Sequence, residues 1–237
     1  MVLLLRAIRH CKFLMLLVVF FPGSRAWGQE TVFDVPSADI LDKGKVYGEL
    51  DGTVHLANQT LATFTPRVVM GVGGGIEVGI NFDGTSTPTL GQLDVAPTVK
   101  WRLWPDGPWG WSFFVGDDLL IPFYQRRYNL GNYGYAFFAK QWKHGTRIGL
   151  GGYDFTHKVV ATGNRAGGQF TFEQQISGRV TLAAEWYTGN HAAGYVNPGA
   201  VIKITPKFTL YTAYQIGNAG ATSGNHQFLW ELGYNFN

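Results

Sequence analysis

The strongest constraint on the fold is an alternation of apolar and polar residues that recurs along most of the chain. The final stretch shows it most clearly, with large apolar side chains at every second position: Phe228, Trp230, Leu232, Tyr234 and Phe236. A period of two is the period of a β-strand that has one apolar face and one polar face. The sequence therefore predicts an all-β protein.

Twelve such segments can be counted, and their spacing narrows the architecture. They run over about 45–56, 61–72, 76–83, 92–103, 109–116, 132–142, 146–156, 170–176, 180–187, 196–204, 208–215 and 226–237. Short turns alternate with longer connections, among them 117–131, and the 57–60 loop is the short exception. An even strand number with this asymmetry is typical of a transmembrane barrel that has its short turns and both termini in the periplasm. A soluble β-sandwich also alternates, but its strands are usually shorter, about 5–6 residues.

The second face of these segments carries many charges, which a soluble core could not bury unpaired. We expect the following side chains to line a barrel lumen: Glu49, Asp51, Arg67, Glu77, Lys100, Arg102, Lys140, Arg147, Glu173, Glu185, Lys203 and Glu231. Two interpretations stay open, a polar pore and a salt-bridge network that closes the lumen. The mixed signs argue against strong selectivity for anions or for cations.

Composition supports a membrane barrel over a soluble domain. Glycine makes up 32 of 237 residues, aromatic residues 15% and charged residues 15%, whereas soluble domains carry about 25% charged residues. No apolar run after the N-terminal segment reaches the length of a transmembrane helix. We expect aromatic side chains to form girdles at the membrane boundaries: Trp101, Trp104, Trp109, Trp111, Trp142, Trp230 and Phe236.

Residues 1–28 have the features of a cleaved secretory signal peptide. Basic residues precede an apolar run from Phe13 to Phe21, and Ala26 and Gly28 supply the small residues of a cleavage site. The run of nine is too short to span a bilayer, which needs about 20 residues, so an N-terminal anchor is the weaker alternative. Its removal takes away four of 19 basic residues and leaves 15 against 16 acidic ones, a net charge of −1. That balance gives no basic excess for binding nucleic acid.

Residues 29–43 precede the first alternating segment and carry no strand pattern. We interpret them as a periplasmic N-terminal segment, with a plug that folds into the barrel mouth as the alternative. Ser37 as N-cap and Gly44 as terminating residue predict a short helix between them. The barrel would then occupy residues 44–237.

The closing stretch, with Phe236 near its end, resembles the last strand of bacterial outer-membrane β-barrels. In that family the final residue is usually aromatic, whereas here Asn237 follows Phe236. The resemblance implies an antiparallel up-and-down barrel in the outer membrane of a Gram-negative bacterium. It also implies two partners, the outer-membrane lipid and the assembly machinery that reads the last strand. The run Val32–Pro36 further resembles the start of poorly characterised exported barrel proteins assigned to transport.

These features lead us to expect a porin-like channel for small polar solutes. The alternatives are a closed barrel with a structural or loop-binding role and a lipid-modifying enzyme. Twelve-stranded outer-membrane phospholipases carry a His-x-Ser-Asn-Gly motif, which this chain lacks, although His55 and Asp51 fall on one face of a predicted strand. We therefore expect no catalytic residues, no cofactor and no metal site, and the single cysteine, Cys11, lies in the signal peptide.

Overall fold

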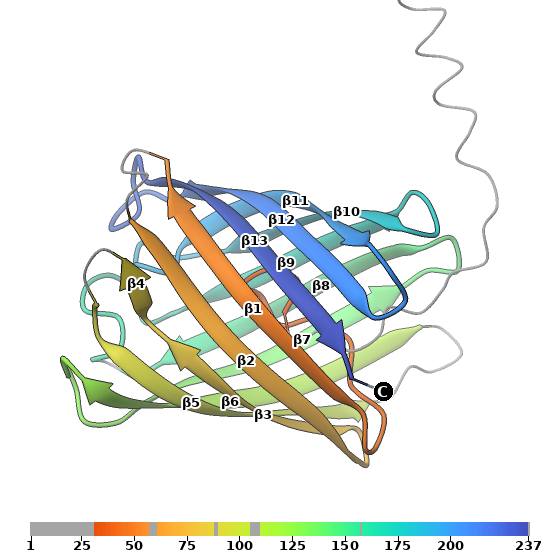
Figure 1. Ribbon diagram of the computed structural model, residues 1–237, viewed down its shortest axis with the longest axis horizontal. Coiled ribbons are helices and arrows are strands. Elements are labelled where there is room, and N and C mark those ends of the chain that lie inside the picture. Colours follow the sequence, from red (N-terminus) through yellow and green to blue (C-terminus); the bar gives the residue numbers. More distant parts are fainter. Residues whose placement is uncertain (1–30, 57–60, 88–89, 105–109, 157, 237) are drawn as a thin grey trace, which may run out of the picture.

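The computed structural model describes residues 31–56, 61–87, 90–104, 110–156 and 158–236, and these form an antiparallel β-barrel (Figure 1). The strands are β1 (Val46–His55), β2 (Ala62–Gly73), β3 (Ile76–Asp83), β4 (Thr85–Thr87), β5 (Leu93–Trp104), β6 (Trp111–Tyr124), β7 (Gly131–Gln141), β8 (Thr146–Phe155), β9 (Ala166–Gln175), β10 (Val180–Tyr187), β11 (Tyr195–Lys203), β12 (Phe208–Gly217) and β13 (His226–Asn235). The predicted signal peptide lies outside the described residues.

The barrel is closed, because β1 pairs with β2 on one side and with β13 on the other. Leu50 lies opposite Leu232 in one pairing and opposite Pro66 in the other. The short β4 pairs with β2 alone and continues β3 after Gly84, whose φ of 88° makes the bend between them. Counting β3 and β4 as one wall strand gives twelve, so the predicted architecture is confirmed.

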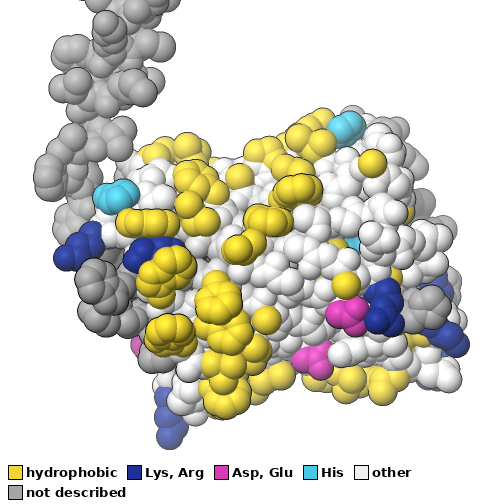
Figure 2. All heavy atoms as spheres, turned by 180° about the vertical axis from the view of Figure 1, so that it is seen from behind, with side chains coloured by type: hydrophobic (Ala, Val, Ile, Leu, Met, Phe, Trp, Pro, Cys, Tyr) yellow, Lys and Arg dark blue, Asp and Glu magenta, His cyan; other side chains and the backbone are white. Residues whose placement is uncertain are grey.

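Burial alternates along the long strands and separates an apolar outer surface from a polar interior. In β13, Leu229 and Glu231 are buried, whereas Phe228 and Leu232 are exposed on the outside. Figure 2 shows apolar side chains gathered in patches over one face of the outer wall. Large exposed apolar surfaces of this kind mark membrane contact, and in a closed barrel every backbone group of the wall can be paired within the sheet.

The strand β6 is longer than the sequence predicted. The interpretation of residues 117–131 as one long connection is wrong, because β6 continues to Tyr124 and pairs with both β5 and β7. The alternation persists through this region, with Leu119, Ile121 and Phe123 on the outside. The alternation is hard to see in the sequence at Asp117 and Asp118. These adjacent acids put a charge on both faces of the strand, one side chain facing outward and the other inward.

Residues 31–42, here called the inner segment, run along the inner wall of the barrel (Figure 1). The predicted helix after Ser37 is wrong, since residues 37–42 have no helical backbone. Their polar groups bind the wall instead: the Leu41 amide donates to Glu77, and the Asp39 carboxylate pairs with Arg147. These contacts stabilise the segment more than helix formation would, because an isolated helix this short is only marginally stable. No helix among the described residues is long and apolar enough to cross a membrane.

Candidate functional site in the barrel lumen

The inner segment is fastened to the wall through the Glu185 carboxylate. Val32 N–H donates to the carbonyl of Val35 at 2.8 Å, which bends the segment into a tight turn. The bend leaves three successive amides facing β10, and Phe33, Asp34 and Val35 donate to Glu185 at 3.0, 2.7 and 3.0 Å. Glu185 is only 2% exposed. Such charge-assisted bonds compensate the burial of the carboxylate and of the three amides.

Asp34 lies at the tip of that turn and is held from two further strands. The side-chain amides of Asn197 and Gln215 each donate to Asp34 Oδ2 at 2.7 Å. Burial raises the pKa of the Asp34 carboxyl, and the hydrogen bond from Asn197, the charge of Arg67 and the hydrogen bond from Gln215 partly offset that shift.

Nearer the short-turn end, ion pairs join the inner segment to the wall. Arg147 binds Glu173 through two parallel hydrogen bonds of 2.7 Å and binds Asp39 at 2.9 Å. Lys100 pairs with Glu77 at 3.2 Å, and the other Glu77 oxygen accepts the Leu41 amide at 2.9 Å. Each of these buried charges therefore meets an opposite charge or a donor.

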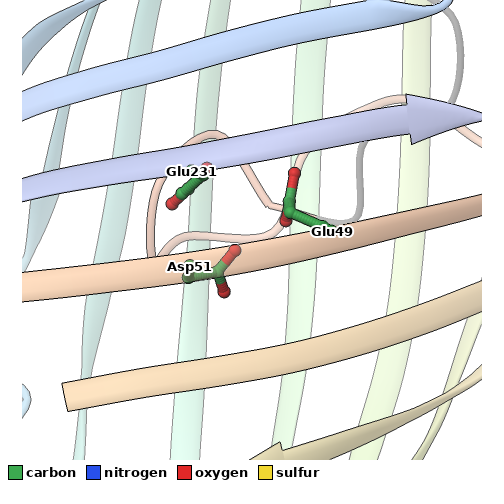
Figure 3. Close-up of side chains that lie close together, drawn as sticks. All are labelled: Glu49, Asp51 and Glu231. Carbon is green, nitrogen blue, oxygen red and sulfur yellow. The ribbon is translucent and has the colours of Figure 1, made fainter.

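A third group gathers three carboxylates around one guanidinium. Figure 3 shows Glu49 and Asp51 of β1 and Glu231 of β13 turned toward one another, and each offers an oxygen within 4.8 Å of the others. Arg67 pairs with Asp51, lies 3.7 Å from Glu49 and donates to Thr31 of the inner segment at 3.1 Å. Carboxylate oxygens suit a hard cation, but the guanidinium already supplies positive charge to two of the three.

Apolar packing fills the space between these polar contacts. Val32 and Phe33 belong to a buried cluster with wall residues of β10–β13. Val35 packs in a second cluster with Phe114 and Phe137. The inner segment therefore occupies the lumen over part of its length, with both polar and apolar contacts.

The lumen is open at the end that carries the longer loops. A cavity of about 640 Å³ lies there, lined among others by Asp34, Asp83, Asp94, Asp118 and Tyr187. Asp94 accepts hydrogen bonds from Gln92 and from the Tyr128 hydroxyl, so the loop after β6 is tied to the rim. A second cavity of about 130 Å³ shares several of these lining residues.

Most of the charged side chains predicted for the lumen lie on inward positions. Buried there are Glu49, Asp51, Glu77, Lys100, Arg147, Glu173, Glu185 and Glu231. Arg67, Arg102 and Lys203 also occupy inward positions and are partly exposed. Whether they line a conducting path stays a prediction.

Lys140 departs from the prediction, because it lies on the outer face of β7. Its ammonium stands 5.0 Å from the centroid of the Trp111 ring and 5.7 Å from that of Trp142. Apolar residues occupy both faces of β7, so the sequence does not fix which face is inner. A long side chain at the membrane boundary can keep its charge in water and its stem on the apolar surface.

The aromatic residues predicted as girdles are found on the outer wall where the structure describes them. Trp101, Trp104, Trp111 and Phe236 are exposed, and Trp104 reaches 58% exposure. Trp142 and Trp230 are partly buried, and Trp109 lies outside the described residues. Their girdle role stays a prediction.

His55, which the sequence places on one strand face with Asp51, and the loop residue His191 both have other partners. His55 contacts Asn225 at 3.2 Å, whereas Asp51 pairs with Arg67. His191 accepts the Ala193 amide at Nδ1 and contacts the Tyr153 hydroxyl through Nε2 at 2.6 Å. Neither histidine hydrogen-bonds to a serine in the described part of the chain.

Several residues of the lumen were not predicted as a group: Asp34, Asn81, Asp118, Asn197 and Gln215. Asn197 and Gln215 fall on polar faces of predicted strands, so the alternation contained a signal for them. Asp118 was assigned to a loop. The position of Asp34 depends on where the inner segment folds, which strand periodicity does not encode.

Comparisons with known proteins agree with this architecture. No protein-family model matches the chain, and no curated protein matches it in sequence. The structure is similar to the KdgM porin in complex with disordered oligogalacturonate, with a TM-score of 0.61 and 8% identity over 81% of this chain and 99% of that one. An active-site mutant of outer membrane phospholipase A from Escherichia coli gives a TM-score of 0.50 at 12% identity, over 84% of this chain and 92% of that one. The chain therefore has the fold of the bacterial outer-membrane β-barrels.

Proposed function

We propose that this protein is an outer-membrane channel for small polar solutes, and that its inner segment acts as a plug in the resting state. The observation that carries the proposal is the Glu185 carboxylate, which accepts three consecutive amides of the inner segment. Hydrogen bonds of this kind, made to a charged group, can be exchanged for bonds to water at a net cost of about 1.5–3 kcal/mol each. A plug held in this way can leave while the barrel wall stays intact.

The distribution of charge and space supports the same proposal. Charged side chains line the inner face along its length. The cavity of about 640 Å³ gives solutes a way in from the longer-loop end. Mixed charges along a lumen favour passage of polar over apolar solutes. The proposal includes removal of residues 1–28 at the membrane and reading of the last strand by the assembly machinery.

A second candidate is a permanently closed barrel that binds ligands at its mouth. The apolar packing around Val32 and Phe33 favours it, because removing these side chains from the lumen would expose buried surface. In that case the inner segment would be a structural core element.

Conductance of the refolded chain from residue 29 onward, measured in a planar bilayer, tests the proposal. Discrete and stable steps that close and reopen would support a channel with a movable plug. A protein that shifts on unboiled gels, as folded barrels do, but never conducts even when it starts at residue 44 and lacks the inner segment would contradict the channel and support the closed barrel.

A further inference from the structure

The smaller cavity lies between the inner segment and the barrel wall, and we infer that it binds the ammonium or guanidinium head of a small organic cation. Its lining comes from the inner segment and from four strands, and it includes Asp34, Arg67, Asn81, Asp83, Asp118 and Tyr133. That such a cation is the transported solute rests on the proposed channel. That the cavity binds it does not depend on the channel.

The cavity is reachable from outside through the mouth. Asp34, Asp83, Asp118 and Tyr133 line both the cavity of about 130 Å³ and the one of about 640 Å³. A solute in the wide mouth therefore meets the same carboxylates before it meets the inner segment.

The lining carries a surplus of negative charge. Three carboxylates, those of Asp34, Asp83 and Asp118, line the cavity together with a single cation, Arg67. Burial raises the pKa of Asp34, but without it two carboxylates still remain. A cleft lined by one sign of charge and enclosed by protein concentrates solutes of the opposite sign.

Asn81 gives an independent indication of a missing hydrogen-bond donor. Its side chain is 6% exposed and lines the cavity, and its Oδ1 atom has no hydrogen-bond partner among the described residues. An unsatisfied buried acceptor costs about 1–3 kcal/mol. A donor bound in the cavity would remove that cost.

The spacing of the acceptors favours an organic cation over a directly coordinated metal ion. In the described part of the chain, the group of three or more acidic side chains close enough to share an ion is Glu49, Asp51 and Glu231, and the cavity carboxylates do not form such a group. An ammonium offers three donors and a guanidinium five, which can reach separated acceptors. The rings of Tyr133 and Tyr135, with centroids 5.3 Å apart, add faces that attract a cation.

This inference departs from the expectation of weak charge selectivity. That expectation weighed all charges of the lumen together. In the structure, most basic side chains of the lumen are paired near the short-turn end or in the Arg67 group, and the path at the mouth is acidic.

Calorimetric titration of the refolded, detergent-solubilised chain tests the site without any need for conduction. Butylammonium chloride, sodium butyrate and magnesium chloride are titrated separately at constant ionic strength. The variants are Asp118→Asn, which removes a charge, and Asn81→Leu, which removes the acceptor at similar volume. Asp117→Asn is the matched control, because Asp117 neighbours Asp118 but faces outward and accepts from Asn132.

We expect saturable binding of butylammonium and none of butyrate. Asp118→Asn and Asn81→Leu should each weaken butylammonium binding about tenfold or more, and Asp117→Asn should leave it unchanged. Equal binding of butylammonium and butyrate, or no effect of either cavity variant, would overturn the site. Saturable binding of magnesium but not of butylammonium would overturn the ligand class. Binding by the chain, with no conductance either from it or from the folded barrel that starts at residue 44, would overturn the channel and keep the site.

Discussion

The two ends of the lumen use the same kinds of side chain but match their charges differently. Toward the short turns, Arg147 joins Glu173 and Asp39, and Lys100 joins Glu77, so buried charges meet opposite charges. Toward the longer loops, carboxylates line two cavities and basic side chains are few. The first arrangement fills and fixes the barrel, whereas the second leaves room and a net field for a solute.

Charge in a barrel lumen is therefore not by itself a sign of a pore. A paired and buried charge is a structural element, because removing its partner leaves an uncompensated ion. Neutralising a half-buried carboxylate beside an open cavity should change the stability of the protein little. Variants at the short-turn end should therefore lower the stability of the barrel, whereas variants at the mouth should mainly change ligand binding. The effects expected below run from the largest to the smallest.

The largest loss of stability is expected at the short-turn end. Arg147→Met would leave the buried Glu173 and the partly buried Asp39 without their cation, and should cost about 3–5 kcal/mol in the free energy of unfolding. Denaturant titration of the refolded barrel measures it. The control is Arg165→Met, whose ion pair with Asp154 is more than half exposed, and it should cost less than about 1 kcal/mol. Equal losses in the two variants would contradict the contrast.

The next effect is local and concerns the hold on the inner segment. Glu185→Gln replaces one accepting oxygen with an NH₂ group that faces backbone donors. Loosening by about 1–3 kcal/mol should speed hydrogen exchange at Phe33, Asp34 and Val35 roughly tenfold to hundredfold. Mass spectrometry of exchanged peptides reads this out. Exchange in those three residues that stays at the wild-type rate would show that the carboxylate is not the anchor.

A smaller effect, confined to one loop at the mouth, depends on pH. His191 accepts the Ala193 amide at Nδ1, so protonation there would set two donors against each other. Burial lowers its pKa from 6.5, so the stability linked to the neutral ring is present above that value and is lost as the pH falls through the lowered pKa. After correction for the intrinsic pH dependence of amide exchange, the protection of amides in residues 188–194 should be lower near about pH 5 than near about pH 7. The difference should vanish in His191→Gln, and its persistence there would rule out this histidine as the cause.

The smallest effect on folding is expected at the cavities. Asp118→Asn should change the free energy of unfolding by less than about 0.5 kcal/mol, because a partly exposed carboxylate beside a cavity keeps contact with water. The same denaturant titration checks it. A loss comparable to that of Arg147→Met would mean that the mouth is structural as well.

The alternation predicted the barrel, its twelve wall strands and the inward position of most charges, because each strand of a closed sheet repeats the same two-sided environment. It did not fix the face of Lys140, where both faces of β7 carry apolar residues. It also ended the predicted strand before the true end of β6, because two adjacent acidic residues, Asp117 and Asp118, are typical of a loop.

The candidate site was less accessible from the sequence than the fold. Asp34 reaches Asn197 and Gln215 only after the inner segment enters the lumen, and nothing in a local pattern specifies that entry. The helix predicted after Ser37 failed for the same reason, since contacts with Glu77 and Arg147 outweigh local propensity. Asn81 sits on a predicted polar face, but its missing partner is a property of the folded cavity.

If the inner segment blocks an otherwise conducting barrel, its removal must open the pore. Single-channel recording of two refolded chains, residues 29–237 and residues 44–237, tests it directly, with the gel shift of each confirming a folded barrel. The longer chain should give rare or small steps, and the shorter one should give large, steady conductance. Equal conductance of the two folded chains, or none from either, would contradict it.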